Sequence, residues 1–176
     1  MGVKSTKALA AALVVLLSAC ASPGSPDPSA APAPAQNFCD AMAVAATTAP
    51  PAVEALDGLF AIMDAMSTSA SAGDIDTLNA AGTTTVSTAT DYAAALDAAA
   101  ALAPAGTAPD IQALSDYWTL YVMGLGQIAE TAPSYASLID QTGALQSSDA
   151  ASSLIAEQPA TQQRVNDSYI AECTNG

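Results

Sequence analysis

Apolar side chains recur at steps of three or four residues along most of the chain after residue 36, which is the spacing of one helix face. The first such series is Phe38, Met42, Ala45, Ala49, Val53, Leu56, Phe60, Met63 and Met66. Pro50 and Pro51 fall inside it, and proline both lacks a backbone donor and clashes with the preceding turn. The pattern therefore predicts a helix that breaks near Ala49 and resumes at Pro51, ending near Ser71.

A second helix is predicted to open at Gly73-Asp74 and to end before Pro104 and Gly106. Its apolar face is Ile75, Leu78, Gly82, Val86, Ala89, Ala93, Leu96 and Ala100. Because threonines and a serine crowd residues 83–90 and form helix poorly, we expect packing rather than intrinsic propensity to stabilise this helix.

The third predicted helix has the clearest start, with Thr107 as the N-cap, Pro109 in the first turn and Asp110 complementing the helix dipole. Its apolar positions follow a 3-4 rhythm: Ile111, Leu114, Trp118, Tyr121, Leu125 and Ile128. Pro133 ends or bends it, and Gly124-Leu125-Gly126 lets a neighbouring helix approach closely.

The rest of the chain predicts a short apolar segment around Leu138, a short helix over 147–158 and a last helix that begins at Pro159. Four main helices with short connections predict an all-α, up-down-up-down four-helix bundle over residues 37–176. In that topology the start of the first helix and the end of the last lie at the same end.

Residues 1–19 have the parts of an export signal: Lys4 and Lys7, then an apolar run over 8–17, then Ser18-Ala19. Ten helical residues rise about 15 Å, half a bilayer core, so this run is too short for a lasting transmembrane helix. Leu17-Ser18-Ala19-Cys20 resembles a bacterial lipobox. The resemblance implies cleavage before Cys20 and a diacylglyceryl group on its thiol, and two acyl chains hold a protein stably at a membrane. The alternative is an ordinary secretory signal.

Residues 20–36 follow the signal as a predicted disordered linker. The segment contains Pro23, Pro26, Pro28, Pro32 and Pro34 and has no apolar periodicity. At about 3.1 Å per residue it could hold the following domain roughly 50 Å from a lipid surface.

Cys39 and Cys173 remain at opposite ends of the helical domain. In an exported protein two such cysteines most simply form a disulfide, and the predicted topology brings them together. Chain-entropy estimates give a loop of more than a hundred residues a stabilisation of about 5 kcal/mol. The alternative is two separate buried thiols.

The charge balance excludes one class of partner. The chain has a net charge of −14, and loss of Lys4 and Lys7 with the leader changes it to −16, leaving Arg164 as the only cation. Such an acidic domain is repelled by nucleic acid. We therefore expect no nucleic acid as a partner. The expected partners are the membrane, through the lipid anchor that the lipobox implies, and an envelope protein.

Three residues are candidate ligand contacts. Arg164 could grip a carboxylate or phosphate, or it could pair with an acid of the domain such as Asp167. Trp118 and Tyr121, with Tyr117, could stack on a sugar or a drug-like ligand, or they could be core residues of a bundle.

No catalytic residue, metal site or cofactor is predicted. The chain has no histidine, and its only two lysines, Lys4 and Lys7, lie in the leader, so a nucleophile in the domain would lack the usual base. Asp74-Ile75-Asp76 lacks the alternating oxygen donors and the sixth-position glycine of a calcium loop. A hydrolase that uses paired carboxylates is the enzymatic reading that remains.

The lipobox, the Pro/Ala-rich linker and the alanine-rich domain (44 alanines in 176 residues) together resemble small lipoproteins of high-GC Gram-positive bacteria. The resemblance implies an extracytoplasmic, membrane-anchored location and a helical domain, with no shared activity. Two functional hypotheses follow: a non-enzymatic binding or scaffolding module of the cell envelope, or a small-ligand-binding lipoprotein that holds an apolar or cationic molecule between helices.

Overall fold

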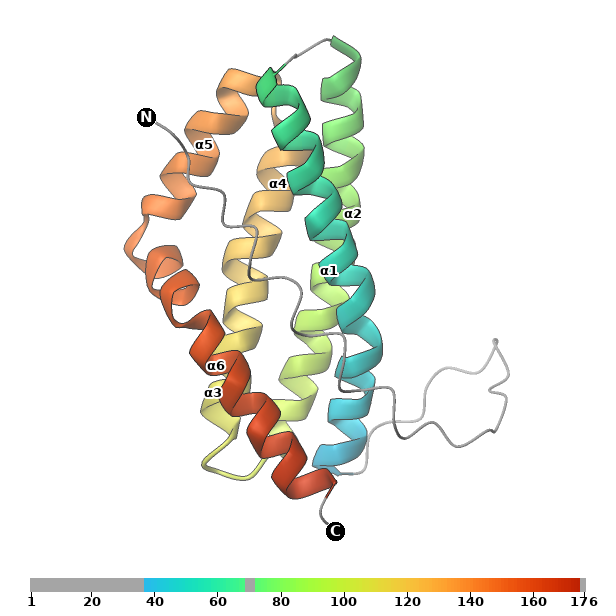
Figure 1. Cartoon of the computed structure of the whole chain (residues 1–176), viewed down its shortest axis with the longest axis vertical. Helices are drawn as coiled ribbons and strands as arrows, with labels where there is room; N and C mark the ends of the chain where they lie inside the picture. Colours follow the sequence, from blue (N-terminus) through green and yellow to red (C-terminus); the bar gives the residue numbers. More distant parts are fainter. Residues whose placement is uncertain (1–36, 69–71, 175–176) are drawn as a thin grey trace, which may run out of the picture.

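The computed structural model describes residues 37–68 and 72–174, and these residues are helical with short connections and no strand (Figure 1). The elements are α1 (Phe38–Thr68), α2 (Ala72–Leu102), α3 (Ala108–Asp116), the π-helix η1 (Tyr117–Val122), α4 (Met123–Thr131), α5 (Tyr135–Ser147) and α6 (Asp149–Cys173). The predicted all-helical class is confirmed for this part of the chain. The predicted signal, Cys20 and the linker lie outside the described residues.

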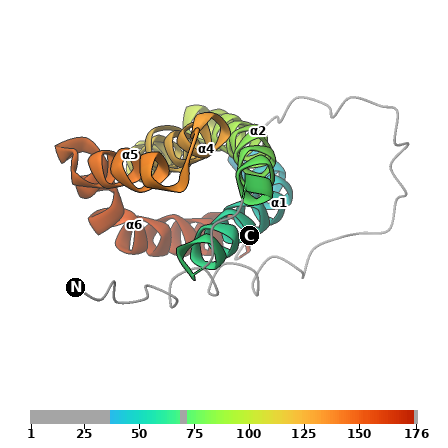
Figure 2. The same cartoon turned by 90° about the horizontal axis from the view of Figure 1, so that it is seen from above.

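The helix α2 occupies the centre of the domain. It packs against α1 on one side and against α3, η1 and α4 on the other. Seen from above, α1 and α2 lie side by side, α5 lies beyond α4, and α6 lies across from α5 (Figure 2). The helix with weak intrinsic propensity thus has the most extensive packing of the described helices, as the prediction that packing must stabilise it requires.

The predicted break at Ala49 is wrong, because α1 runs through Pro50 and Pro51 without interruption. Both prolines are exposed, whereas Ala49 and Ala52 on either side of them are buried. A proline inside a helix costs about 3 kcal/mol. Since α1 packs along α2 on both sides of the prolines, this packing outweighs the lost hydrogen bonds.

The elements α3, η1 and α4 form one continuous helical segment, the third rod, which runs from Ala108 to Thr131 and includes the π-helical turn η1. Thr107 occupies the N-cap position as predicted, but its hydroxyl makes no capping hydrogen bond. On the predicted apolar face, Ile111, Leu114, Trp118, Tyr121 and Leu125 are buried, and Ile128 packs partly buried against the core.

Two glycines bring α2 and α4 into backbone contact. A Cβ atom added to Gly82 would lie 2.6 Å from the carbonyl oxygen of Gly126 and 2.9 Å from the carbonyl carbon of Ala129. The Asn79 amide supports the same crossing by donating to the Ala129 carbonyl at 2.6 Å. The predicted close approach at the Gly124–Gly126 segment is therefore confirmed, and its centre is Gly126.

For the last quarter of the chain, the sequence predicted shorter and more numerous helical segments than the structure has. The helix α5 has thirteen residues and runs through Gly143, and α6 has twenty-five and runs through Pro159. Pro159 is exposed. Ser148 is the only residue between the two helices, and its hydroxyl caps α6 by accepting a hydrogen bond from the Ala151 amide.

The ends of the described chain meet at one end of the domain. The helix α1 begins there, α6 ends there, and α2 and the third rod run between the two ends in opposite directions (Figure 1). Among the described residues, none of the helices is both long enough and apolar enough to cross a membrane.

Candidate functional site

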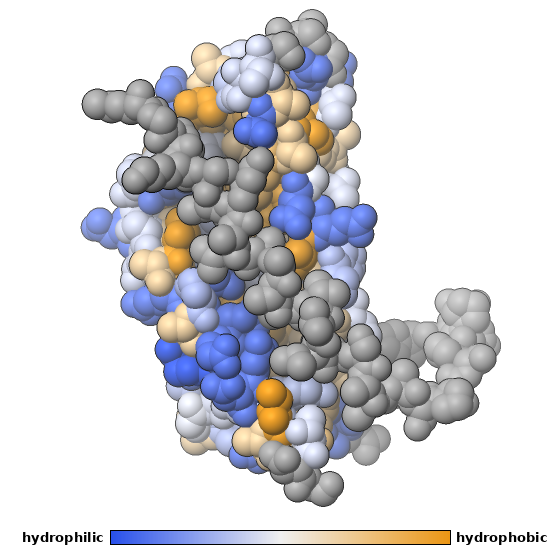
Figure 3. Space-filling view, viewed as in Figure 1, coloured by the Kyte–Doolittle hydropathy of each residue, from blue (hydrophilic) through white to orange (hydrophobic). Residues whose placement is uncertain are grey.

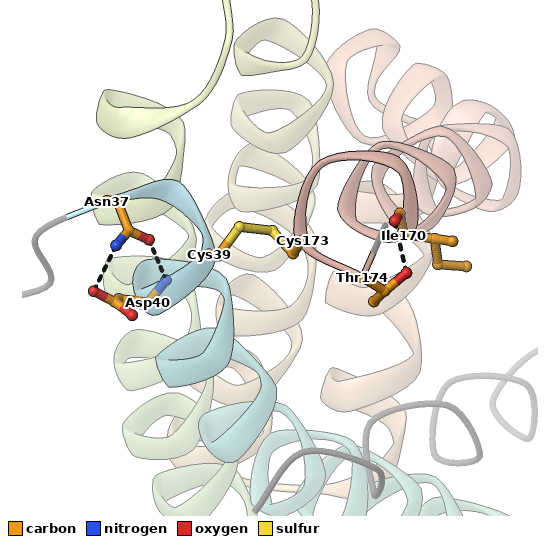
Figure 4. Close-up of a disulfide and its surroundings, with 6 residues drawn as sticks. All are labelled: Asn37, Cys39, Asp40, Ile170, Cys173 and Thr174. Atoms are coloured by element: carbon orange, nitrogen blue, oxygen red, sulfur yellow. Dashed lines mark hydrogen bonds between the residues drawn. A yellow bond between two sulfur atoms is a disulfide. The ribbon is translucent and has the colours of Figure 1, made fainter. Parts of the chain in front are cut away.

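The disulfide between Cys39 and Cys173 joins the first turn of α1 to the last turn of α6 (Figure 4). The two Cα atoms lie 5.6 Å apart, within the usual range for a bridge. The Asn37 side chain caps α1 by accepting from the Asp40 amide at 2.9 Å, so the cysteine is held in regular helix geometry. The predicted pairing thus closes a loop with a sequence separation of 134.

Four aromatic side chains gather between α2 and η1. Tyr92 meets Trp118 edge to face with ring centroids 4.9 Å apart, and Tyr117 lies 6.1 Å from Trp118 and 5.5 Å from Tyr121. Trp118 is 5% exposed and Tyr121 is 7% exposed. The structure therefore places the two predicted aromatic candidates in the core, where aromatic pairs add to the stabilisation from buried area.

The phenols of this cluster stay neutral well above physiological pH. Burial, with a smaller effect from Tyr121, raises the pKa of Tyr117 to about 12. Burial also raises the pKa of Tyr92 and that of Tyr121, although a hydrogen bond from Gln146 opposes the rise at Tyr121. These side chains can donate or accept a hydrogen bond but do not supply a base at neutral pH.

One face of α5 brings polar groups to the edge of the aromatic cluster. The Gln146 amide donates to the Tyr121 hydroxyl at 3.2 Å. One turn earlier, Thr142 is 7% exposed, and its hydroxyl has no hydrogen-bond partner among the described residues. Threonines elsewhere in these helices, such as Thr84 and Thr131, donate to the carbonyl four residues earlier. Thr142 is thus a buried hydroxyl whose hydrogen-bonding capacity is unused.

Arg164 binds an acid of the same domain. Its Nε and Nη2 each lie 2.8 Å from Oδ1 of Asp110, in the first turn of α3, and Nη2 also donates to the Thr161 hydroxyl at 3.1 Å. Asp167 instead accepts from Gln163. Arg164 therefore forms an ion pair within the domain, which is one of the two predicted roles. Its partner is Asp110 and not Asp167. Hydrogen bonding to Asp110 raises the pKa of Arg164, so the guanidinium stays charged.

No group of three or more histidine, cysteine, aspartate or glutamate side chains converges to hold a metal ion within the described ranges. Asp74, of the segment Asp74-Ile75-Asp76, lies in the first turn of α2. The sequence reasoning missed Tyr92, Thr142 and Gln146. Tyr92 is adjacent to Ala93 on the predicted face and was detectable, whereas nothing in the spacing around Thr142 indicates an unpaired hydroxyl.

Comparisons of the chain with protein-family models, with curated proteins and with solved structures found no match.

Proposed function

We propose that the protein is a membrane-anchored extracytoplasmic lipoprotein whose helical domain is a non-enzymatic binding or scaffolding module of the cell envelope. The observation that carries the proposal is Leu17-Ser18-Ala19-Cys20 at the end of a ten-residue apolar run. The bridge between Cys39 and Cys173 supports it, because disulfides persist in oxidising compartments outside the cytosol.

The composition of the domain supports a binding role over a catalytic one. Residues 37–176 contain neither histidine nor lysine, and Arg164 is their only cation. That cation is engaged with Asp110, and the aromatic cluster is packed as core. A protein partner in the envelope would meet a negatively charged helical surface, so its own contact surface is expected to carry lysine or arginine.

The arrangement of the helices fits a tethered module. We take α5 and α6 together as the fourth, descending limb of an up-down-up-down bundle, behind a cleaved signal and a linker over residues 20–36. The chain then enters the domain at Asn37, beside the disulfide. A lipid on Cys20 would leave this end of the domain nearest the membrane.

The anchor is tested by Cys20→Ser. We expect the wild-type protein in the membrane fraction with a lipid mass on Cys20, because two acyl chains hold a protein stably there. The Cys20→Ser protein should keep its leader and lack the lipid mass. Mass spectrometry and fractionation measure both properties.

Cys39→Ser is the matched control, because it removes a cysteine without touching the lipobox, and it should remain lipidated. A Cys20→Ser protein that still sediments with membranes at the leader-cleaved size would refute the anchor. So would an unmodified Cys20 in wild-type protein extracted from membranes.

A second candidate function, binding of a small apolar or cationic ligand, is favoured by Thr142. Its hydroxyl is buried and has no hydrogen-bond partner among the described residues, and it lies one helical turn before Gln146, whose amide donates to the Tyr121 hydroxyl. Leaving such a group unsatisfied costs about 1–3 kcal/mol, which a ligand with an acceptor or donor at this position would recover.

Thr142→Val tests this candidate, because valine keeps the shape and removes the hydroxyl. Without ligand, the variant should be more stable by about 1 kcal/mol in urea denaturation, since the unpaired group is gone. Spermidine and oleate serve as cationic and apolar probes in a thermal-shift assay, with sodium chloride at matched ionic strength as the control for screening. A shift present in wild type and lost in Thr142→Val supports the candidate; no shift with either probe contradicts it.

A further inference from the structure

We propose that α6 is a detachable strap whose docking onto α3 and η1 depends on the redox state of the Cys39–Cys173 bridge. "Strap" here means residues Asp149–Cys173. The proposal concerns the helical domain alone and does not rest on the lipid anchor.

The strap buries few side chains for its length. Of its twenty-five residues only Ala151, Thr161 and Val165 are buried. The thirty-one residues of α1 include seven buried ones, among them Phe38, Leu59 and Met66. Segments with few buried apolar contacts are the ones that open locally below the free energy of global unfolding.

The outer surface of the strap is hydrophilic, so it can face water whether the strap is docked or detached. Hydrophilic side chains gather over its lower half on the face shown in Figure 3. Gln163, Arg164 and Asp167 are among its exposed residues. The apolar side chains that detachment would expose are chiefly Ala151 and Val165, which are buried, and Ile155, which packs partly buried against the core.

Besides the bridge, the clearest attachment of the strap is the ion pair from Arg164 to Asp110. The Arg164 side chain is 51% exposed and that of Asp110 is 24% exposed, so water and salt weaken this pair. The helix α6 packs on α3 and η1 and meets α1 where the disulfide lies. The bridge is thus the strongest link at the C-terminal end of the strap.

The other end of the strap has a hinge. Ser148 is the single residue between α5 and α6, and its backbone is extended, with a ψ of 141°. Rotation at this one residue would swing α6 away while α5 stays on α4 through Leu145, beside Gly124, and on η1 through the Gln146–Tyr121 hydrogen bond. The strap is therefore held by the chain at one end and by a reducible bond at the other.

Both cysteines are half-buried, so a dithiol can reach the bridge. A thiolate of the dithiol attacks one sulfur and forms a mixed disulfide, and the other cysteine leaves as a thiolate. The second thiol of the reductant then releases the first cysteine. In total the bridge gains two electrons and two protons, and the dithiol becomes a disulfide. Without the bridge, α6 detaches from α3 and η1 while α1 to α4 stay folded.

Hydrogen exchange measured by mass spectrometry tests the proposal on the full chain carrying Cys20→Ser, which leaves Cys39 and Cys173 as the only thiols. After dithiothreitol treatment, amides of residues 149–173 should exchange at least about tenfold faster, and this acceleration should be larger than that of the amides of α2 and α4. Adding Cys39→Ser and Cys173→Ser should reproduce the pattern without reductant and make the chain insensitive to it.

Three results would overturn the proposal. Equal acceleration in all helices, with loss of helical circular dichroism, would show that the bridge stabilises the whole domain rather than the strap. Unchanged exchange over 149–173 in the reduced chain would show that the ion pair and Val165 hold α6 without it. In the oxidised chain, Arg164→Ala should accelerate exchange only within the strap, and acceleration in α2 would also contradict the proposal.

Discussion

Gly82→Ala is expected to destabilise the domain by at least about 3 kcal/mol, at the upper end of the cost of overpacking. The added methyl group would collide with backbone atoms of α4, namely the Glu130 amide nitrogen, the Gly126 carbonyl and the Ala129 carbonyl carbon. Backbone atoms cannot rotate aside as side chains do, so α2 and α4 must separate. Urea denaturation with linear extrapolation measures the loss.

Gly58→Ala is the matched control. Gly58 lies inside α1, it is exposed, and a Cβ added there meets nothing within 4 Å. Alanine is a better helix former than glycine, so this variant should be more stable by about 0.5–1 kcal/mol. If Gly82→Ala lay within about 1 kcal/mol of wild type, the close crossing of α2 and α4 would be wrong.

Trp118→Ala is expected to cost about 3–5 kcal/mol, the usual cost of truncating a large buried aromatic side chain. The substitution removes the edge-to-face contact with Tyr92 and leaves a cavity between α2 and η1. Urea denaturation followed by far-ultraviolet circular dichroism is the appropriate measurement, because Trp118 is the only tryptophan and its fluorescence is lost with it.

Leu120→Ala provides the comparison from the same π-helical segment, since Leu120 is 40% exposed and should change stability by less than about 1 kcal/mol. Similar small effects for both substitutions would place Trp118 at an open surface and would favour its role as a ligand contact. The large effect expected for Trp118→Ala also makes this variant unsuitable as a binding probe. Thr142→Val, which changes one hydroxyl, is the better choice.

Periodicity predicted most of the helical architecture, and packing between segments distant in sequence explains where local rules failed. The apolar rhythm from Ile111 to Leu125 places the third helix and its buried face correctly. The prolines at 50, 51 and 159 gave wrong helix boundaries, because a local rule assigns them a cost and cannot include the opposing packing energy. That energy depends on partners far away in sequence, such as α2 for the two prolines of α1.

Among the candidate site residues, too, some contacts could be predicted from the sequence and others could not. The Cys39–Cys173 pairing was predictable because a count of cysteines and the helix directions both led to it. The partner of Arg164 was not, since sixteen acids in the domain are equivalent in sequence and only the placement of α6 on α3 selects Asp110. The unpaired hydroxyl of Thr142 depends on a side-chain rotamer and lies beyond any sequence pattern.

The position of the disulfide also determines how the domain bears mechanical load. A pull on residue 37 enters the domain two residues before Cys39, at the start of α1, and passes through the sulfur atoms into the last turn of α6. The tension is then shared by the first and last helices from the outset. While the disulfide is intact, α1 cannot be peeled from the domain on its own from its N-terminal end. A force applied to the oxidised domain must displace α1 and α6 together.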